Sequence, residues 1–378
     1  MTFDSSKQFD MIHAERRAGA SPTLSHSTGN TDALIAGFPK TRFYGSKRRL
    51  LNWIHASLKD LAFDTVLDGF GGTASVSLLF KAMGKKVTFH DGLLCNTIAA
   101  KALLSTPLSV RDVREMITFI SSIKPTRGFV SQTFSGMYYT DTENRWLDGA
   151  ALAIHQEKNP GRRSVYFYCL FQACLKKRPF NLFHRANLNL RLNQDVTRSF
   201  GNWVTWQRSF PSLMKAAIAD LTSLPTNKSQ RAKILSHGDI TRLTGNYDLV
   251  YLDPPYVNRS KVTDDYLQRY HFLEGLSRYP NWKRHLDTNS PLKAIRRYPY
   301  ISEWQDRRKF KDRLFKVISA HRKSTVVLSY LADAVPSQSE ILAHFTANFR
   351  FVDVHTKELG HALAKSKKTE LLFIGRNL

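Results

Sequence analysis

Short apolar runs alternate with amphipathic segments in the first third of the chain, and this pattern predicts a parallel α/β sheet. It predicts strands over 65–67 and 86–90 and helices over 74–83 and 94–104. Thr73 is expected to cap the first of these helices, and Gly84 to end it. A strand, a glycine-rich turn, a helix and a second strand together form a βαβ unit.

The alternation lapses after residue 104 and resumes near residue 232. Later apolar runs predict strands over 233–235, 249–252, 325–330, 349–354 and 370–374. Residues 105–231 are helical and rich in aromatic and basic residues, so we interpret them as a domain inserted into the α/β domain formed by 39–104 and 232–378. Residues 1–38 show no sustained hydrophobic period, and we expect a disordered extension without an assigned role.

The charge of the chain is strongly one-sided, because 56 Lys and Arg face 31 Asp and Glu, a formal charge of +25. A polyanionic partner is the simplest reason to hold so much self-repelling charge. Three cysteines without metal-ligand spacing predict a reducing, cytoplasmic compartment. No run approaches the ~18 apolar residues of a membrane span, and no signal-peptide segment is recognisable, so no membrane association is expected.

The loop 68–73, Asp-Gly-Phe-Gly-Gly-Thr, lies between a predicted strand and a predicted helix, where free backbone N–H groups bind ligands. Asp91 ends the next strand, at the place where an acid commonly accepts hydrogen bonds from ribose hydroxyls. The loop matches neither G-x-G-x-x-G nor a Walker motif, which argues against a dinucleotide and a nucleoside triphosphate. S-adenosylmethionine is therefore the expected cofactor.

Asp253-Pro254-Pro255-Tyr256 follows the apolar strand 249–252, at the sheet edge where ligands bind. The prolines restrict the backbone, so the Asp253 carboxylate and the Pro254 carbonyl can be held toward one point. Adenine N6 is a poor nucleophile, and two acceptors on its two N–H groups would favour a pyramidal nitrogen. Tyr256 would stack on an extruded base. This chemistry needs no metal, and His184, His237 and His271 lack partners at ligand spacing, so no metal is predicted.

The segment 176–185 interleaves basic, aromatic and amide side chains, which suits contact with phosphates near bases. Its predicted DNA-binding residues are Lys176, Lys177, Arg178, Asn181 and Arg185. The charge run 307–309, by contrast, is interpreted as the solvated face of an amphipathic helix.

At these motifs the chain resembles the adenine-N6 DNA methyltransferases in which the cofactor motif comes first and the catalytic tetrapeptide follows the target-recognition insert, as in Dam-like and many restriction-system enzymes. The resemblance covers about residues 40–376 and includes 42–50, 133–140, 238–239, 270–276 and 370–374. It implies a Rossmann-like methyltransferase sheet with an inserted, mainly helical target-recognition domain. It also implies cofactor-binding roles for Phe43, Lys47, Asp68, Gly69, Phe70, Gly72, Asp91 and Asp239.

The resemblance further implies site-specific methylation of a flipped-out adenine in double-stranded DNA, with S-adenosylmethionine as the methyl donor. We expect a monomer and leave open a cognate restriction endonuclease as a second partner. Two alternatives remain at this point: an RNA methyltransferase of the same fold, and a relative that binds DNA without catalysis. The tetrapeptide begins with Asp rather than Asn, and the insert resembles that of DNA enzymes, which argues against the first alternative; the complete tetrapeptide argues against the second.

Overall fold

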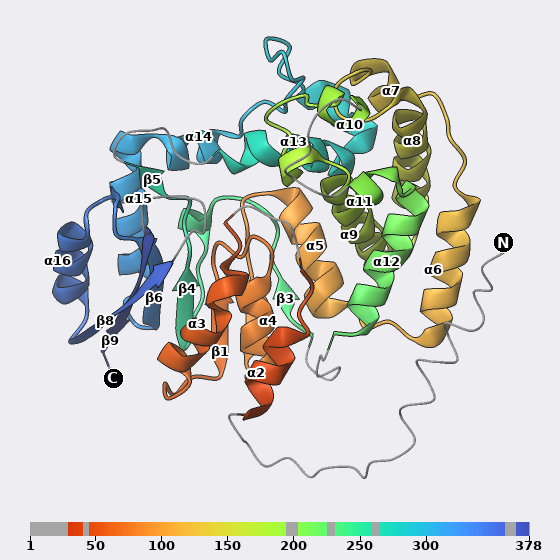
Figure 1. The fold of residues 1–378 in the computed structure, drawn as a ribbon. Coiled ribbons are helices and arrows are strands. Elements are labelled where there is room, and N and C mark those ends of the chain that lie inside the picture. Colours follow the sequence, from red (N-terminus) through yellow and green to blue (C-terminus); the bar gives the residue numbers. More distant parts are fainter. Residues whose placement is uncertain are drawn as a thin grey trace, which may run out of the picture.

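A computed structural model of the chain describes residues 29–40, 45–193, 203–224, 231–258, 265–359 and 368–377. A seven-stranded sheet in the order β3-β2-β1-β4-β6-β9-β8 forms its centre, and β5 and β7 form a separate two-stranded sheet (Figure 1). The strands are β1 (Thr65–Asp68), β2 (Lys86–Phe89), β3 (Lys233–Ile234), β4 (Leu249–Leu252), β5 (Val257–Asn258), β6 (Thr325–Leu331), β7 (Ala334–Val335), β8 (Phe351–Leu359) and β9 (Lys368–Arg376).

Neighbours from β3 to β6 pair in parallel, while β9 runs antiparallel to both β6 and β8. The strand order reverses at β1: the chain builds outward to β2 and β3 on one side and to β4 and β6 on the other. The mostly parallel sheet confirms the predicted α/β class, and the strands lie within a few residues of their predicted positions.

Successive residues of the central strands face two separate hydrophobic cores. Val66 of β1 and Tyr251 of β4 belong to one core, and Leu67 and Val250 belong to the other. Helices α3 (Leu51–Leu58), α4 (Ser75–Ala82) and α5 (Leu94–Ser105) cover the first face, and α15 (Arg307–Ala320) and α16 (Gln338–Asn348) cover the second. Since both faces are covered, β4 is buried at all of its positions, which explains its continuous apolar sequence.

A helical part lies beside this sheet (Figure 1). It contains α6 (Val110–Ser122), α7 (Phe129–Thr133), α8 (Asp141–Gln156), α9 (Pro160–Lys176), α10 (Asn189–Leu192), α11 (Trp203–Gln207) and α12 (Phe210–Thr222). Helix α9 is its centre: Asn159 caps its first turn, its residues 164–175 are all buried, and it packs against both α5 and α12. The contact with α5 joins the helical part to the sheet in one continuous core.

Residues beyond the tetrapeptide complete the helical part. Helix α13 (Tyr266–Ser277) is followed by the 3₁₀ helix η4 (Tyr279–His285). The Phe272 ring of α13 stacks on Phe183 with centroids 5.0 Å apart and meets Phe134 and Trp282 edge-on at 5.2 and 5.3 Å. This core therefore contains side chains from the predicted insertion 105–231 and from residues that follow it. The extent of the inserted domain stays a prediction.

Two local predictions are wrong. Residues 29–36 form helix α2 (Gly29–Ala36), and Ile35 and Phe38 are buried in the core, so the part of the extension nearest the sheet is ordered; residues 1–28 lie outside the described residues. The N-cap of α4 is Ala74 in the left-handed region (φ 59°), without a side-chain cap, while the Thr73 hydroxyl bonds to that of Ser75 at 2.6 Å. Two small polar side chains here bond to each other rather than to the helix.

Two other local predictions are confirmed. Gly84, at φ 77°, follows α4 as expected of a helix-ending glycine. The charges at 307–309 are exposed on the first turn of α15. None of the helices within the described ranges is long and apolar enough to cross a lipid bilayer.

Candidate active site

The reversal of strand order at β1 opens a crevice between the loops that leave β1 and β4. Asp68 is the last residue of β1 and pairs in register with Tyr251 of β4, two residues before Asp253. Asp91 follows the end of β2, the other neighbour of β1. Three acidic residues that are distant in the sequence therefore reach one sheet edge because they follow adjacent parallel strands.

A cavity of about 870 Å³, part of it open to solvent, occupies this crevice. Among its lining residues are seven of the predicted site residues: Lys47, Asp68, Phe70, Gly72, Asp91, Asp253 and Pro255. The structure thus brings residues of the predicted cofactor loop and of the predicted catalytic tetrapeptide into one cavity. Gly69, Pro254, Tyr256 and Asp239 lie next to lining residues without lining the cavity themselves, and Phe43 is outside the described residues.

Asp91 is fixed by three hydrogen-bond donors. Its Oδ2 accepts from the backbone N–H of Gly72 at 2.9 Å, and its Oδ1 accepts from the N–H of Leu93 at 2.8 Å and from Nδ2 of Asn96 at 3.0 Å. Burial raises the pKa of Asp91, and these donors oppose that shift. Gly72 adopts φ +49°, a conformation that favours glycine, so the loop can turn its N–H toward the acid.

Asp68 is almost completely buried at the base of the cavity, with 1% of its surface exposed. The Ser77 hydroxyl donates to its Oδ2 at 2.6 Å. Burial raises the pKa of Asp68 to about 7. Its charge is therefore sensitive to a cation placed in the cavity.

Asp253 belongs to a compact polar cluster. The Lys47 ammonium lies 2.8 Å from Asp253 Oδ1, 3.0 Å from Glu370 Oε1 and 2.5 Å from the Tyr256 hydroxyl. The Tyr256 hydroxyl lies 2.8 Å from Asp253 Oδ1 and 2.9 Å from Glu370 Oε1, which also accepts from the Ser329 hydroxyl at 2.9 Å. Lys47, which we expected to contact the cofactor, thus lines the cavity with its charge placed against Asp253.

Tyr256 is oriented by its ring as well as by its hydroxyl. The ring meets Tyr330 of β6 edge-on with centroids 5.6 Å apart, and the Lys47 ammonium lies 4.8 Å from its centre. Pro255, the residue before it, lines the cavity. The predicted stacking of Tyr256 on a base stays a prediction.

Helix α14 (Pro299–Gln305) forms a wall of the cavity that sequence reasoning missed. Trp304 meets Phe70 edge-on with centroids 5.1 Å apart, and the Tyr300 hydroxyl donates to the Gly92 carbonyl at 2.8 Å. Pro299 at the first turn and two aromatic residues four positions apart were available signals of a helix with one aromatic face.

Asp239 lies behind this wall. Its carboxylate accepts hydrogen bonds from Arg313 at 2.6 Å, the Thr241 hydroxyl at 2.7 Å and Trp304 Nε1 at 3.4 Å. Burial acts to raise the pKa of Asp239, but the bonds from Arg313 and Thr241 lower it below its usual value. The acid therefore holds the aromatic wall in place.

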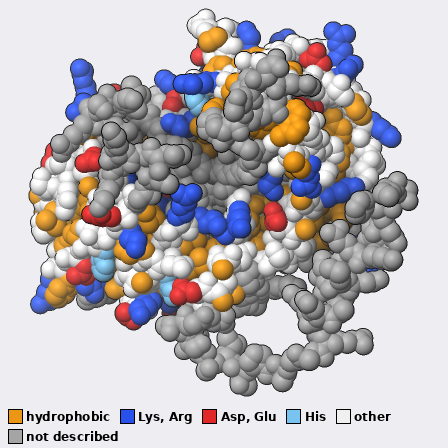
Figure 2. Space-filling view, in the orientation of Figure 1, with side chains coloured by type: hydrophobic (Ala, Val, Ile, Leu, Met, Phe, Trp, Pro, Cys, Tyr) orange, Lys and Arg blue, Asp and Glu red, His pale blue; other side chains and the backbone are white. Residues whose placement is uncertain are grey.

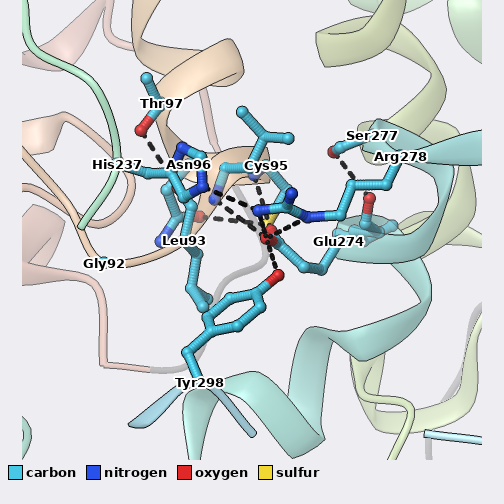
Figure 3. A network of polar contacts seen from close by, with 12 residues as sticks. Gly92, Leu93, Cys95, Asn96, Thr97, His237, Glu274, Ser277, Arg278 and Tyr298 are labelled. Atoms are coloured by element: carbon cyan, nitrogen blue, oxygen red, sulfur yellow. Dashed lines mark hydrogen bonds and ion pairs between the residues drawn. The ribbon is translucent and has the colours of Figure 1, made fainter. Parts of the chain in front are cut away.

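A second polar cluster surrounds Glu274 of α13, which is completely buried (Figure 3). Its carboxylate accepts from the first backbone N–H groups of α5, Leu94 at 3.2 Å and Cys95 at 2.9 Å, and from the Tyr298 hydroxyl at 2.7 Å. Arg278 bridges Glu274 to His237. An acid from the helical part thus caps the helix that follows Asp91, which connects the two halves of the molecule beside the cavity.

The structure contradicts two of the predicted DNA contacts. Lys177 and Arg178 are 2% and 1% exposed. Lys177 donates to the carbonyls of Trp206 and Arg208, at 2.8 and 2.6 Å, and pairs with Glu143 at 2.8 Å. Arg178 donates to three carbonyls of the following loop, Leu182, Arg185 and Ala186. Both cations satisfy backbone acceptors inside the helical part and cannot reach phosphates.

The remaining predicted DNA-binding residues differ in their placement. Arg185 is exposed on the loop that Arg178 holds. Lys176 is partly exposed, 3.6 Å from Asp220, and the side chain of Asn181 lies outside the described part.

Two of the three histidines singled out in the sequence, His271 and His237, have polar partners. His271 is fully buried, with Nε2 3.0 Å from the Tyr138 hydroxyl, and burial lowers its pKa to about 3. His237 accepts from Arg278 at 2.7 Å, and His184 is partly buried. In the described ranges no three His, Cys, Asp or Glu side chains form a group that could hold a metal ion.

The mostly parallel seven-stranded sheet is consistent with a methyltransferase fold. A family model for the D12 class N6 adenine-specific DNA methyltransferases matches residues 43–300, more than half of the chain, and the chain therefore belongs to this family. The Type II methyltransferase M2.HphI of Haemophilus parahaemolyticus is 24% identical over 351 residues, which cover 90% of this chain and 98% of that protein. Modification methylase LlaI of Lactococcus lactis subsp. lactis is 24% identical over 270 residues, 64% of this chain and 39% of that protein.

Proposed function

We propose that this enzyme transfers the methyl group of S-adenosylmethionine to N6 of a flipped-out adenine at a specific site in double-stranded DNA. The observation that carries the proposal is the shared cavity: Gly72 of the glycine-rich loop and Asp91 after β2 line the same space as Asp253 and Pro255 of the tetrapeptide. A nucleoside cofactor at one end would therefore meet a target base at the other.

The side chains of the cavity fit S-adenosylmethionine, which supplies a methyl group on a positively charged sulfur. Asp91 would hold the ribose hydroxyls, and Phe70 and Trp304 offer aromatic surface for the cofactor adenine. The acids Asp68 and Asp253 favour a cationic ligand, and Lys47, a cation among the lining residues, is already paired with Asp253 and Glu370.

At the catalytic end, the Asp253 carboxylate and the Pro254 carbonyl would accept the two N–H groups of adenine N6. This arrangement would direct the nitrogen lone pair toward the methyl group for in-line displacement. Tyr256 would support the extruded base. The hydrogen bonds from Lys47 and Tyr256 both end on Asp253 Oδ1, so Oδ2 would be the oxygen that accepts the N6 amine.

For the duplex, we infer a path over the exposed basic residues of the helical part. Two segments pack on one buried tyrosine: the Tyr138 hydroxyl lies 3.0 Å from the Phe183 carbonyl and 3.2 Å from that of Leu292. Arg185 is exposed on the first segment and Lys293 on the second, which is closed by a bridge between residues 286 and 295. Lys and Arg side chains also form a band across the middle of the face in Figure 2. Phosphate contacts of this kind position a duplex.

We further propose that residues 105–231 serve target recognition and that the enzyme acts in a restriction-modification system. The first proposal is supported by the helical part lying beside the sheet that carries the cavity residues (Figure 1). The second is supported by the names of both relatives, a Type II methyltransferase and a modification methylase.

Replacing the catalytic acid tests this function. Asp253→Ala should lower methyl transfer to DNA by at least 100-fold, because an acceptor aimed at N6 is lost, a loss on the order of that for one oxyanion-hole donor. The assay follows isotopic methyl transfer from S-adenosylmethionine to mixed-sequence duplex DNA, with digestion to nucleosides to identify N6-methyladenine. Asp353→Ala, which removes a half-exposed acid of β8, is the matched control and should keep wild-type turnover.

Three outcomes would oppose the proposal. Near-normal turnover in Asp253→Ala would remove the catalytic role. Wild-type transfer to RNA in preference to DNA would favour the RNA alternative, and a wild-type enzyme that binds DNA without transfer to any sequence would favour the non-catalytic one.

A further inference from the structure

Glu370 is a buried acid at the edge of the active site that the proposed chemistry does not use. Only 2% of its surface is exposed, and it lies near the start of β9, opposite Leu331 at the end of β6. It does not line the cavity, so it is not placed to touch a substrate. Its partners are nevertheless the groups that hold the catalytic acid.

Three donors converge on Glu370 Oε1: the Lys47 ammonium at 3.0 Å, the Tyr256 hydroxyl at 2.9 Å and the Ser329 hydroxyl at 2.9 Å. Lys47 and Tyr256 also contact Asp253 Oδ1, each at 2.8 Å. One cation is therefore shared between a partly buried carboxylate, Asp253, and a buried one, Glu370. Neither the lysine nor the tyrosine reaches Asp253 Oδ2 in the part of the chain that the structure describes.

We propose that Glu370 is a positioning residue for methyl transfer: it anchors Lys47 and Tyr256, so that they hold Asp253 through Oδ1 and leave Oδ2 for the adenine amine. This inference rests on the proposed function of Asp253.

Without the Glu370 charge, Lys47 has a single carboxylate partner and is drawn fully to Asp253. An ammonium in that position competes with the N6 amine for the acceptor and makes the carboxylate a weaker hydrogen-bond acceptor. The single proton of the Tyr256 hydroxyl lies within reach of both carboxylates, so Glu370 shares this donor with Asp253 as it shares the lysine. Two carboxylates around one lysine thus keep the catalytic acid electron-rich while its orientation stays fixed.

The pH dependence of turnover distinguishes positioning from a structural role. The titratable groups that face Asp253 are Lys47 of η1 (Lys47–Leu50), Asp68 of β1, Tyr251 of β4, Tyr256 and Glu370 of β9. Burial raises the pKa of Asp253, Lys47 lowers it, and the Glu370 charge raises it. Removing the Glu370 charge should therefore move the acidic limb of kcat to lower pH.

Glu370→Gln keeps the shape of the side chain and removes its charge. We expect kcat to fall on the order of 10- to 100-fold, as for a slightly misplaced catalytic group, with little change in KM for S-adenosylmethionine or DNA. The acidic limb of kcat should move to lower pH, and Glu370→Asp should restore its wild-type position. The control is Glu143→Gln, which neutralises a largely buried, lysine-paired acid of α8 and should reduce stability while leaving the acidic limb in place.

A stability measurement tests the charge sharing without reference to activity. In urea unfolding of the free protein, Lys47→Met should be strongly destabilising, because a buried and a partly buried carboxylate lose their shared cation. The double variant Lys47→Met/Glu370→Gln should lose less stability than the sum of the single variants. A wild-type kcat and an unmoved acidic limb in folded Glu370→Gln would overturn the positioning role. Absence of methyl transfer by the wild type would instead overturn the proposed function, while the coupling in stability would persist.

Discussion

Replacing Lys177 tests whether its charge supports the fold, as its buried contacts indicate, or binds DNA, as its sequence context predicts. Lys177→Met keeps most of the hydrocarbon stem and removes the ammonium. The buried carbonyl of Trp206 and the partly buried carbonyl of Arg208 then lose their donor, whereas Glu143 keeps its two bonds from Arg191 at 2.9 and 2.8 Å. Each unpaired acceptor costs about 1–3 kcal/mol, and relief from burying a cation offsets part of this. We expect a loss of about 2–4 kcal/mol in the free energy of unfolding.

The matched comparison uses Arg185→Met/Lys293→Met, which removes two exposed charges. For that variant the slope of log K for DNA against log salt should flatten by about 0.9 for each phosphate that the protein no longer neutralises, with stability nearly unchanged. Lys177→Met should show the opposite behaviour, a wild-type slope with reduced stability. Urea unfolding and a salt titration of DNA affinity measure both quantities. A flattened slope without loss of stability in Lys177→Met would refute the assignment of this lysine to the fold.

Two predictions concern the cofactor. Asp91→Ala should weaken S-adenosylmethionine binding by about 1–3 kcal/mol, because the ribose hydroxyls lose an acceptor; calorimetry showing unchanged affinity would exclude the ribose role. Affinity for this cationic cofactor should also fall, by up to about tenfold per pH unit, as the pH drops below the Asp68 pKa of about 7, because the protonated acid has no charge to attract a cation. Asp68→Asn should remove that dependence, and a wild-type affinity independent of pH from 5 to 8 would contradict it. The contribution of Asp68 to the free energy of unfolding has the opposite pH dependence. Because its pKa is raised in the folded state, this contribution is fully present below about pH 4 and is lost as the pH rises through about 7.

The elements that the sequence predicted well are those buried on both sides. Strand β4 begins and ends as predicted, at 249 and 252, because a short run of apolar residues is typical of a strand covered on both faces. The position of Asp91 relative to the glycine loop was also predictable, since a βαβ unit brings the ends of adjacent parallel strands together. Topology alone thus determined most of the cofactor half of the site.

The charge run at 176–178 shows where such reasoning fails. In the sequence, three consecutive cations indicate a surface, but α9 ends at residue 176 and the next two side chains turn inward. Their acceptors are carbonyls of the loop at 182–186 and of residues 206 and 208. Whether a cation meets phosphate or carbonyl oxygen depends on backbone that comes together only in the folded chain, and local pattern carries no information about it.

Glu370 could not be placed for a related reason. Parallel strands present their final residues at the catalytic edge, so a search of strand ends finds Asp68, Asp91 and Asp253. Strand β9 is antiparallel to β6, and it therefore contributes a residue from its beginning, with Glu370 opposite Leu331. The period of a strand is two, so a register shift of one residue would bring Thr369 or Leu371 to that position and turn the acid to the other face. The charge beside Lys47 and Tyr256 is thus set by the register of an antiparallel strand that lies far from both residues in the sequence.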